Sequence, residues 1–342
     1  MNEEKEKTPS FQKINYSLRT AKNIERKMII EALHRLSFFD PVKNYTYIGF
    51  GSTFFTDFSL FHKQMGIDKL YSIELEKDLK SRFEFNKPFH CINIIYKHSN
   101  EALKDPMLKW NDRKIIWLDY DYKITADVII DIDQVVEKCS SGDAFLITLN
   151  ASSNKIFSEP NAKDKSRLRA FEKFKKQFIL KVEEDDLIDY SDLVDGTIQP
   201  SDLADWGLAN VCTKIINTRI FEKLRDRNEE NEDEPLYKKL NYKKIFDFHY
   251  QDGAPMMTVG FIFYNDDEQV LYEQCKFNDF DFCSNLPYLI KAPNLTMKEI
   301  QYIDSFLPSN LENMSEIGIP DDEIEGYQEV YRYFPAFLEA LR

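Results

Sequence analysis

The segment Asn44-Tyr-Thr-Tyr-Ile-Gly-Phe-Gly-Ser-Thr-Phe-Phe-Thr-Asp57 begins as a β-rich apolar run, passes through Gly49 and Gly51, and continues as a helical pattern. A strand that enters a helix through a tight glycine turn brings its backbone close to a bound nucleotide. Two glycines also occur in ordinary strand-to-helix turns, so this pattern is not specific by itself. It predicts a cofactor site only if an acidic strand end follows.

Such a strand end follows about twenty residues later, the spacing typical of a dinucleotide-binding unit. The run Leu70-Tyr-Ser-Ile-Glu-Leu-Glu76 is strand-like and ends in carboxylates. A carboxylate there can accept hydrogen bonds from ribose hydroxyls, and Glu74 is favoured over Glu76 because it directly follows the apolar run. No third glycine follows Gly51 within its segment, although many dinucleotide sites carry one. The pattern therefore favours an adenosine-containing cofactor without a diphosphate.

Two further strand-like runs, 242–253 and 256–264, surround a Gln-Asp-Gly-Ala-Pro turn and predict a β-hairpin. A chain that alternates strands and helices and closes with such a hairpin resembles the class I S-adenosylmethionine-dependent methyltransferases. The resemblance covers residues 44–265. It implies an α/β fold with a doubly wound, mostly parallel seven-stranded sheet that ends in an antiparallel hairpin, with a helical insertion and a C-terminal extension. The implied cofactor is S-adenosylmethionine.

The resemblance also orders the chain between these segments. The runs 91–96, 114–119 and 143–150 correspond to the third, fourth and fifth strands. The family usually contacts adenine just after the third strand and faces the methyl donor at the end of the fourth. The implied cofactor-binding residues are Gly49, Gly51, Ser52, Thr53, Glu74, Ser99, Asn100 and Asp119.

Methyl transfer mainly requires alignment of donor and acceptor, and a base is needed only where the acceptor must lose a proton. Asp121, Asp119 and Tyr120 are the candidate catalytic residues, with Asp121 preferred. The sequence departs from the family at its first motif, because the run Tyr45-Thr-Tyr-Ile-Gly49 lacks the usual acidic residue. Asp57 or Asp119 is expected to take over that role.

Three functions are compatible with these features. The leading one is S-adenosylmethionine-dependent methyl transfer to an unidentified acceptor. A catalytically silent S-adenosylmethionine-binding subunit is the alternative, suggested by the missing carboxylate. A Rossmann-like enzyme that uses another nucleotide is the third, although the terminal hairpin argues against a dehydrogenase and the sequence contains no GxxxxGK[ST] phosphate loop.

The acceptor can be narrowed by exclusion. The run Asp119-Tyr-Asp-Tyr122 lacks the prolines found in enzymes that methylate the amines of DNA bases, and none of the five cysteines follows a proline. A DNA base is therefore disfavoured, and oxygen or another group is favoured. The cysteines are widely spaced without a CxxC pair, so we expect free thiols and no metal site.

Composition predicts a cytoplasmic globular protein. The chain has 342 residues, 43% of them hydrophobic, and no run approaches the ~18 apolar residues of a membrane span. The first residues are charged and lack the apolar core of a signal peptide. We expect an N-terminal helical segment at 1–43, a methyltransferase-like domain at 44–265 with an insertion at about 151–240, and an acidic extension at 266–342.

The acidity is concentrated at one end. Residues 265–342 hold 5 basic and 16 acidic residues of a chain whose net charge is −14, which disfavours nucleic acid as a partner. The same region carries aromatic residues that could form a homo-oligomer or protein interface, or seal the extension onto the domain. These are Tyr327, Tyr331, Tyr333, Phe334 and Phe337.

One basic stripe stands out near the other end. Arg19, Lys22 and Arg26 follow helical spacing within an amphipathic pattern from residue 15 to 36. The favoured interpretation is a solvated face balanced by Glu25 and Glu31. The alternative is a helix that packs beside the carboxyl edge of the sheet and offers cations to a carboxylate or phosphate.

Overall fold

A computed structural model describes residues 19–181, 187–194, 196–308 and 318–336. Its centre is an eight-stranded sheet in the order β10-β8-β9-β5-β4-β1-β2-β3. The parallel part comprises β1 (Thr46–Gly49), β2 (Lys69–Glu74), β3 (Ile92–Tyr96), β4 (Lys114–Asp119) and β5 (Ala144–Asn150). All five lie at the positions expected from the sequence.

The expected hairpin is also present. β8 (Leu240–Asp252) and β9 (Ala254–Asn265) pair antiparallel, and β9 joins the parallel part by pairing antiparallel with β5. β8 consequently runs in the same direction as β4 and β5. Its last residue, Asp252, therefore lies at the edge of the sheet where the parallel strands also end.

The expected seven strands are one too few. β10 (Tyr288–Ile290) pairs parallel with β8 at residues 248–250 and becomes the outermost strand. A three-residue strand is too short to give a clear sequence pattern. It covers part of β8, whose backbone groups would otherwise be open to pairing with another chain.

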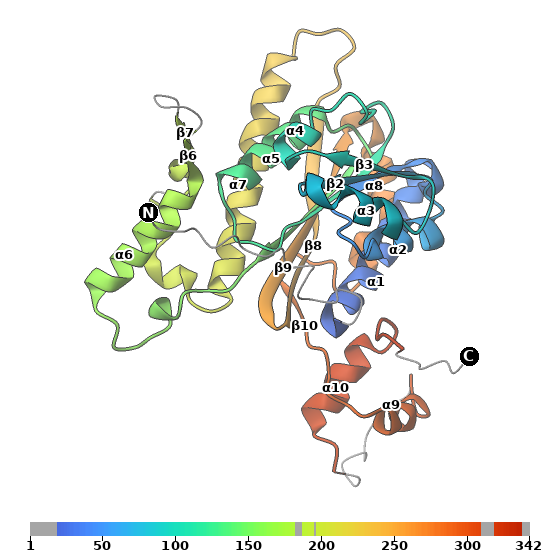
Figure 1. Ribbon diagram of the computed structural model, residues 1–342, viewed down its shortest axis with the longest axis vertical. Helices are drawn as coiled ribbons and strands as arrows, with labels where there is room; N and C mark the ends of the chain where they lie inside the picture. The colour runs from blue at the N-terminus through green and yellow to red at the C-terminus, as the bar shows by residue number, and fades with distance from the viewer. Residues whose placement is uncertain (1–18, 182–186, 195, 309–317, 337–342) are drawn as a thin grey trace.

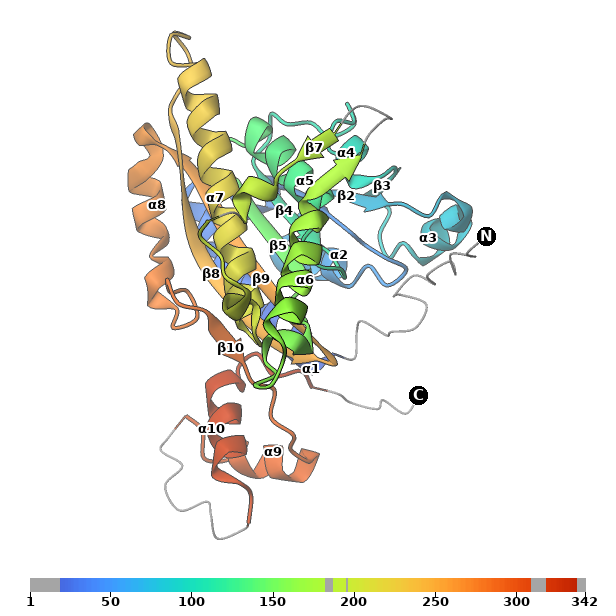
Figure 2. The ribbon, with the colours of Figure 1, turned by 90° about the vertical axis from the view of Figure 1, so that its left-hand side faces the viewer.

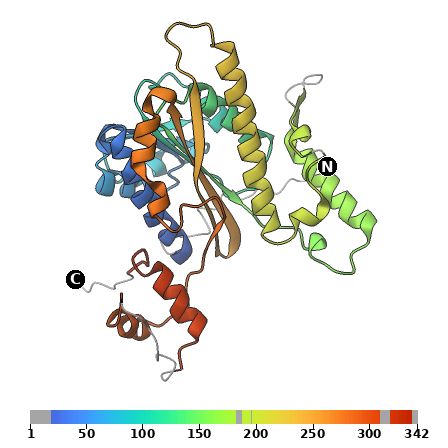
Figure 3. The same cartoon turned by 180° about the vertical axis from the view of Figure 1, so that it is seen from behind.

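Helices cover both faces of the sheet. One face carries α1 (Thr20–His34), α2 (Thr56–Met65) and α8 (Gln269–Cys275), and the other carries α4 (Ser99–Ala102), α5 (Ala126–Lys138) and α7 (Gly207–Glu230). α7 and α8 lie on opposite sides of the hairpin strands (Figures 2 and 3). Each face buries its own apolar core, as a doubly wound sheet requires.

The predicted insertion divides into two parts. α7 packs along α5 and supplies the crossover between β5 and β8, so it belongs to the basic fold. The rest forms α6 (Asp164–Lys175) and a separate small hairpin, β6 (Ile179–Lys181) with β7 (Leu187–Asp189). Phe174, Phe178 and Val194 anchor this part in the core of the α5 face.

The C-terminal residues form two kinds of contact. α8 and β10 are integral to the sheet core, which includes Cys275 and Ile290. α9 (Met297–Asp304) and α10 (Asp321–Val330) form a small cluster of their own below the sheet, at the end near α1 and β10 (Figure 1). α3 (Lys80–Asn86) completes the α-helices of the described ranges. None of the helices in these ranges combines the length and apolar content needed to span a bilayer.

Candidate functional site

The glycine turn lies between the end of β1 and the start of α2. It is at the edge of the sheet where the parallel strands end, here called the carboxyl edge. Gly51 donates its backbone N–H to Glu74 Oε1 and to Ser72 Oγ, each at 3.0 Å. Ser72 Oγ is in turn 2.7 Å from Glu74 Oε1. The turn and the acidic end of β2, both predicted from the sequence, are thus joined directly.

The backbone of this turn is tightly constrained. Ser52 and Phe55 adopt left-handed conformations with φ of 51° and 47°, which non-glycine residues rarely adopt. A Cβ on Gly51 would lie 2.6 Å from the Phe55 ring and from Ser72 Oγ. Such strained residues often lie at functional sites. Only glycine fits at Gly51, although the contact is with the protein itself and not with a ligand.

Glu74 is almost completely buried, with 6% of its surface exposed. Burial raises the pKa of its carboxyl group to about 7, although the hydrogen bonds from Ser72 and Gly51 oppose this shift. Perturbed carboxyl groups of this kind often mark functional sites.

A group of buried charges lies beside the turn. Lys22 Nζ contacts Asp119 at 3.1 Å, Glu25 Oε2 at 2.9 Å and the Tyr250 hydroxyl at 3.1 Å. Burial lowers the pKa of Lys22, but attraction by Asp119 and Glu25 outweighs this effect and raises it above its usual value. Lys22 therefore carries its charge at neutral pH.

Asp57, the other residue expected to replace the missing carboxylate of the first motif, forms an ion pair with Arg26. Arg26 Nε contacts Asp57 Oδ1, and both side chains are nearly inaccessible to solvent. The side chain of Asp119 remains 19% exposed, against 8% for Asp57. Of the two carboxylates, Asp119 is the more accessible to a ligand.

These contacts correct one interpretation of the sequence. Lys22, Glu25 and Arg26 do not form a solvated face, because all three are buried at 2% exposure or less. The alternative interpretation placed this helix beside the carboxyl edge of the sheet, and α1 does pack there. Asp252, at the end of β8, accepts from the backbone N–H groups of Ala21 and Lys22 and so fixes the start of α1 there. The cations of this helix face carboxylates of the same chain.

The residues after β3 and β4 form a second polar group. Tyr120 donates to Asp131 Oδ2 at 2.6 Å, and both residues are buried. Burial and Asp131 raise the pKa of the Tyr120 hydroxyl well above its usual value, so the hydroxyl stays protonated. Burial also raises the pKa of Asp131 to about 6, although hydrogen bonds from Ser99 and Tyr120 oppose this shift.

The other predicted residues occupy the same edge. Ser99 begins α4 and Asn100 Nδ2 lies 3.4 Å from Asp127 Oδ1. Phe50 packs edge-on against Tyr120, with ring centroids 5.2 Å apart, which connects the glycine turn to the end of β4. Thr53 is buried within the turn, and Asp121 is exposed just beyond β4.

Two surface hollows lie elsewhere on the molecule. They have volumes of about 660 and 570 Å³, and both are lined by Tyr242 and Lys243, near the beginning of β8 and beside α7. The carboxyl edge has the strained turn, the buried carboxylates and the buried cations. We therefore take that edge, and not these two hollows, as the candidate functional site.

Residues 14–341 match the model of the family described as "Putative O-methyltransferase". The chain belongs to this family. The methyltransferase resemblance inferred from the sequence is thereby confirmed, and the strand order agrees with the expected fold. No curated protein matches the sequence.

Solved structures resemble the chain only distantly. DesVI of Streptomyces venezuelae is 13% identical over 37% of this chain and 50% of its own, with a TM-score of 0.28. An O-methyltransferase family protein from Burkholderia thailandensis is 12% identical over 69% and 55%, with a TM-score of 0.31. TYW2 of M. jannaschii, solved in complex with AdoMet, is 16% identical over 75% and 80%, with a TM-score of 0.34. The chain spans about half the length of the first two, and the family assignment rests on the family model alone.

Proposed function

We propose that this protein transfers a methyl group from S-adenosylmethionine to an oxygen atom of an acceptor other than a DNA base. Membership of the O-methyltransferase family supports both the reaction and the cofactor. The observation that carries the proposal is the buried Glu74 carboxyl group, held 3.0 Å from the Gly51 backbone N–H at the carboxyl edge of the sheet. Ligands of open α/β sheets bind at this edge.

Glu74 would bind the ribose. Its Oε1 atom accepts from Gly51 and Ser72, which fixes the orientation of the carboxyl group. We propose that Oε2 accepts from the ribose hydroxyls. Ser52 and Thr53 would line the same turn, and Ser99 and Asn100 would contact the adenine.

Asp119 would bind the ammonium group at the methionine end of the cofactor, because its side chain is partly exposed. Lys22 is buried and would hold Asp119 in position through their ion pair. Asp119 would thus supply the carboxylate that the first motif lacks. This assignment removes the main reason for the alternative of a catalytically silent subunit.

Asp121 is our proposed general base, because it is exposed beside the partly exposed Asp119. Tyr120 would instead orient the loop, because its hydroxyl is bound to Asp131 inside the core. A base is needed only if the acceptor hydroxyl must be deprotonated before attack on the sulfonium methyl group. A cytoplasmic location and an interface at 266–342 remain predictions.

Calorimetric titration of the full chain tests the proposal. We expect one equivalent of S-adenosylmethionine or S-adenosylhomocysteine to bind, and neither NAD nor ATP to do so. Binding of NAD or ATP without S-adenosylmethionine would favour the other Rossmann-like enzymes. Formation of S-adenosylhomocysteine with a panel of hydroxyl-bearing acceptors then separates an active enzyme from a silent subunit.

A further inference from the structure

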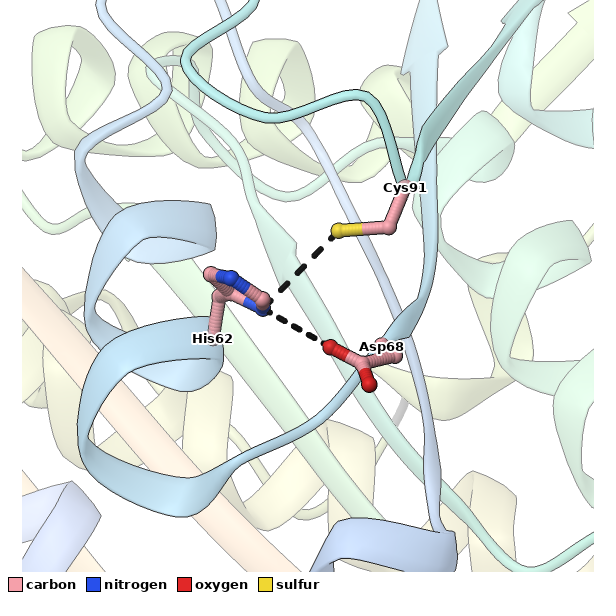
Figure 4. A group of neighbouring side chains, drawn as sticks. All are labelled: His62, Asp68 and Cys91. Carbon is pink, nitrogen blue, oxygen red and sulfur yellow. Dashed lines mark hydrogen bonds and ion pairs between the residues drawn. The ribbon is translucent and has the colours of Figure 1, made fainter.

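A second group of side chains lies at the opposite edge of the sheet. His62 is in the last turns of α2, Asp68 immediately precedes β2, and Cys91 immediately precedes β3. The three side chains point toward one another from these separate segments (Figure 4). β2 has six residues, so roughly 20 Å of strand separates this group from Glu74 at the carboxyl edge.

The distances between the donor atoms suit a small tetrahedral ion. His62 Nδ1 lies 3.1 Å from Asp68 Oδ1 and 3.8 Å from Cys91 Sγ, and all three donor atoms lie within 4.8 Å of one another. Zinc bonds of about 2.0–2.3 Å with tetrahedral angles place donor atoms roughly 3.3–3.6 Å apart. The two separations from His62 lie on either side of this range, and the one between Asp68 and Cys91 is at most 4.8 Å, so side-chain rotations would complete the geometry.

The chemistry of the donors also favours zinc. Imidazole nitrogen, thiolate sulfur and carboxylate oxygen are its usual ligands, whereas magnesium and calcium prefer oxygen alone. Cys91 is the one cysteine that is partly accessible, since the other four are buried. Asp68 is 75% exposed, which leaves a path for an ion to enter.

The neighbouring residues hold the histidine in place. The His62 ring packs against Phe89 with ring centroids 4.2 Å apart. His62 Nδ1 also lies 3.0 Å from the carbonyl oxygen of Ile67. Without an ion, the Nδ1–H group can donate a hydrogen bond to this carbonyl or to Asp68. With an ion bound, Nδ1 must be deprotonated and present its lone pair to the metal.

We propose that His62, Asp68 and Cys91 bind one zinc ion that fastens α2 to the beginnings of β2 and β3. The fourth position would be taken by water or by the Ile67 carbonyl oxygen. The site would be structural, because it lies at the edge of the sheet opposite the proposed cofactor. This site is independent of the proposed methyl transfer. It departs from the expectation of no metal site, which arose because residues 62, 68 and 91 form no metal-binding sequence motif.

Metal titration of the tag-free, chelator-treated full chain tests this site. We expect one Zn²⁺ per chain and a higher Tm in its presence. Co²⁺ in place of Zn²⁺ should give the absorption of a thiolate-bound cobalt ion. Cys91→Ser is nearly isosteric and should weaken zinc binding by about tenfold or more, with loss of that absorption.

His90→Ala is the matched control, because His90 is exposed next to Cys91 and outside the group. It should bind zinc like the unaltered protein. Equal affinities of Cys91→Ser and His90→Ala would overturn the proposal, as would a bound cobalt ion without thiolate absorption. The absence of one-to-one zinc binding would identify the group as an ordinary ion pair with a neighbouring thiol.

Discussion

Glu74 is buried at the carboxyl edge and is the proposed ribose ligand. Its folded-state pKa of about 7 lies above the ordinary value of 4.5, so the folded protein retains a proton that the unfolded chain releases. Its contribution to stability is therefore complete below about pH 4.5 and is lost as the pH rises toward 7. The ionised carboxylate is the form that would accept hydrogen bonds from both ribose hydroxyls. Cofactor binding should therefore offset the stability that is lost when Glu74 ionises.

The first prediction concerns the pH dependence of that binding. We expect S-adenosylmethionine to bind more tightly as the pH rises through about 7, by up to about tenfold per pH unit below the pKa. Glu74→Gln should remove this component and weaken binding at pH 8 by about 1.5–3 kcal/mol. Calorimetry at several pH values measures both effects.

Glu76→Gln is the matched control for this prediction, because Glu76 is the other carboxylate after this strand and is only partly buried. We expect that variant to retain the pH dependence. A Glu74→Gln protein whose pH profile matches that of the unaltered chain would place the ribose elsewhere.

The second prediction concerns Gly51. A Cβ there would meet the Phe55 ring and Ser72 Oγ at 2.6 Å, so Gly51→Ala should destabilise the fold by about 1–3 kcal/mol and displace the N–H that Glu74 accepts. Cofactor affinity should fall with it. Gly326→Ala in α10 is the control, because the nearest atom to its added Cβ lies at 3.9 Å. Thermal unfolding of the two variants, with and without cofactor, measures the difference.

At the scale of elements, the sequence predicts the strands better than it predicts the surroundings of α1. The seven strands β1–β5, β8 and β9 are found because each combines an apolar run with a nearby turn signal, whereas the three-residue strands β6, β7 and β10 give no such pattern. Exposed and buried ion pairs have the same helical spacing, so the sequence alone does not show that the charges of α1 are buried. Only the packing of α1 against the carboxyl edge shows that Asp119 and Asp57 are the partners of Lys22 and Arg26.

The third prediction concerns this helix. Lys22→Met removes a charge that contacts Asp119 and Glu25 in the interior, and should lower stability by about 3–5 kcal/mol while abolishing cofactor binding. Lys27→Met is the control, because Lys27 is partly exposed and donates to the Phe334 carbonyl oxygen. It should affect both measurements much less.

The double variant Lys22→Met/Asp119→Asn separates the two effects. Removal of the unpaired carboxylate should restore part of the stability, whereas cofactor binding should stay lost. Chemical denaturation and calorimetry on the three variants distinguish these outcomes. Full recovery of binding in the double variant would show that the pair serves folding alone.

At the scale of the whole molecule, the C-terminal region joins the sheet core through α8, β10 and the last residue of α10, whereas α9 and the rest of α10 form a cluster of their own. Tyr327 is buried and donates to Asp304, Tyr333 contacts Glu31 of α1, and Val330 lies in the sheet core. Of the aromatic residues suggested for a partner interface, Phe337 lies outside the described residues. The contact of Tyr333 with α1 and the position of Val330 support the sealing role, whereas Tyr327 packs within the extension itself.

The fourth prediction follows from these contacts. Removal of all residues after Asp266 deletes α8 and β10, uncovers one face and one edge of the sheet, and should give an aggregated product. Removal of residues after Ala292 keeps α8 and β10 and should leave a folded but less stable monomer. Light scattering and circular dichroism compare the two. If the protein truncated after Asp266 is soluble and folded, residues 266–342 are a separate interaction module instead.

The cap that Asp252 places on α1 also has a kinetic consequence. The capping bonds join residues 231 and 230 positions apart in sequence. A ribosome makes α1 first and the β8–β9 turn much later, so α1 cannot reach its native position until most of the chain has emerged. Such distant contacts are slow to form. During synthesis the apolar side of α1 therefore stays without its final partner, and the nascent protein should depend on chaperones longest at its oldest segment.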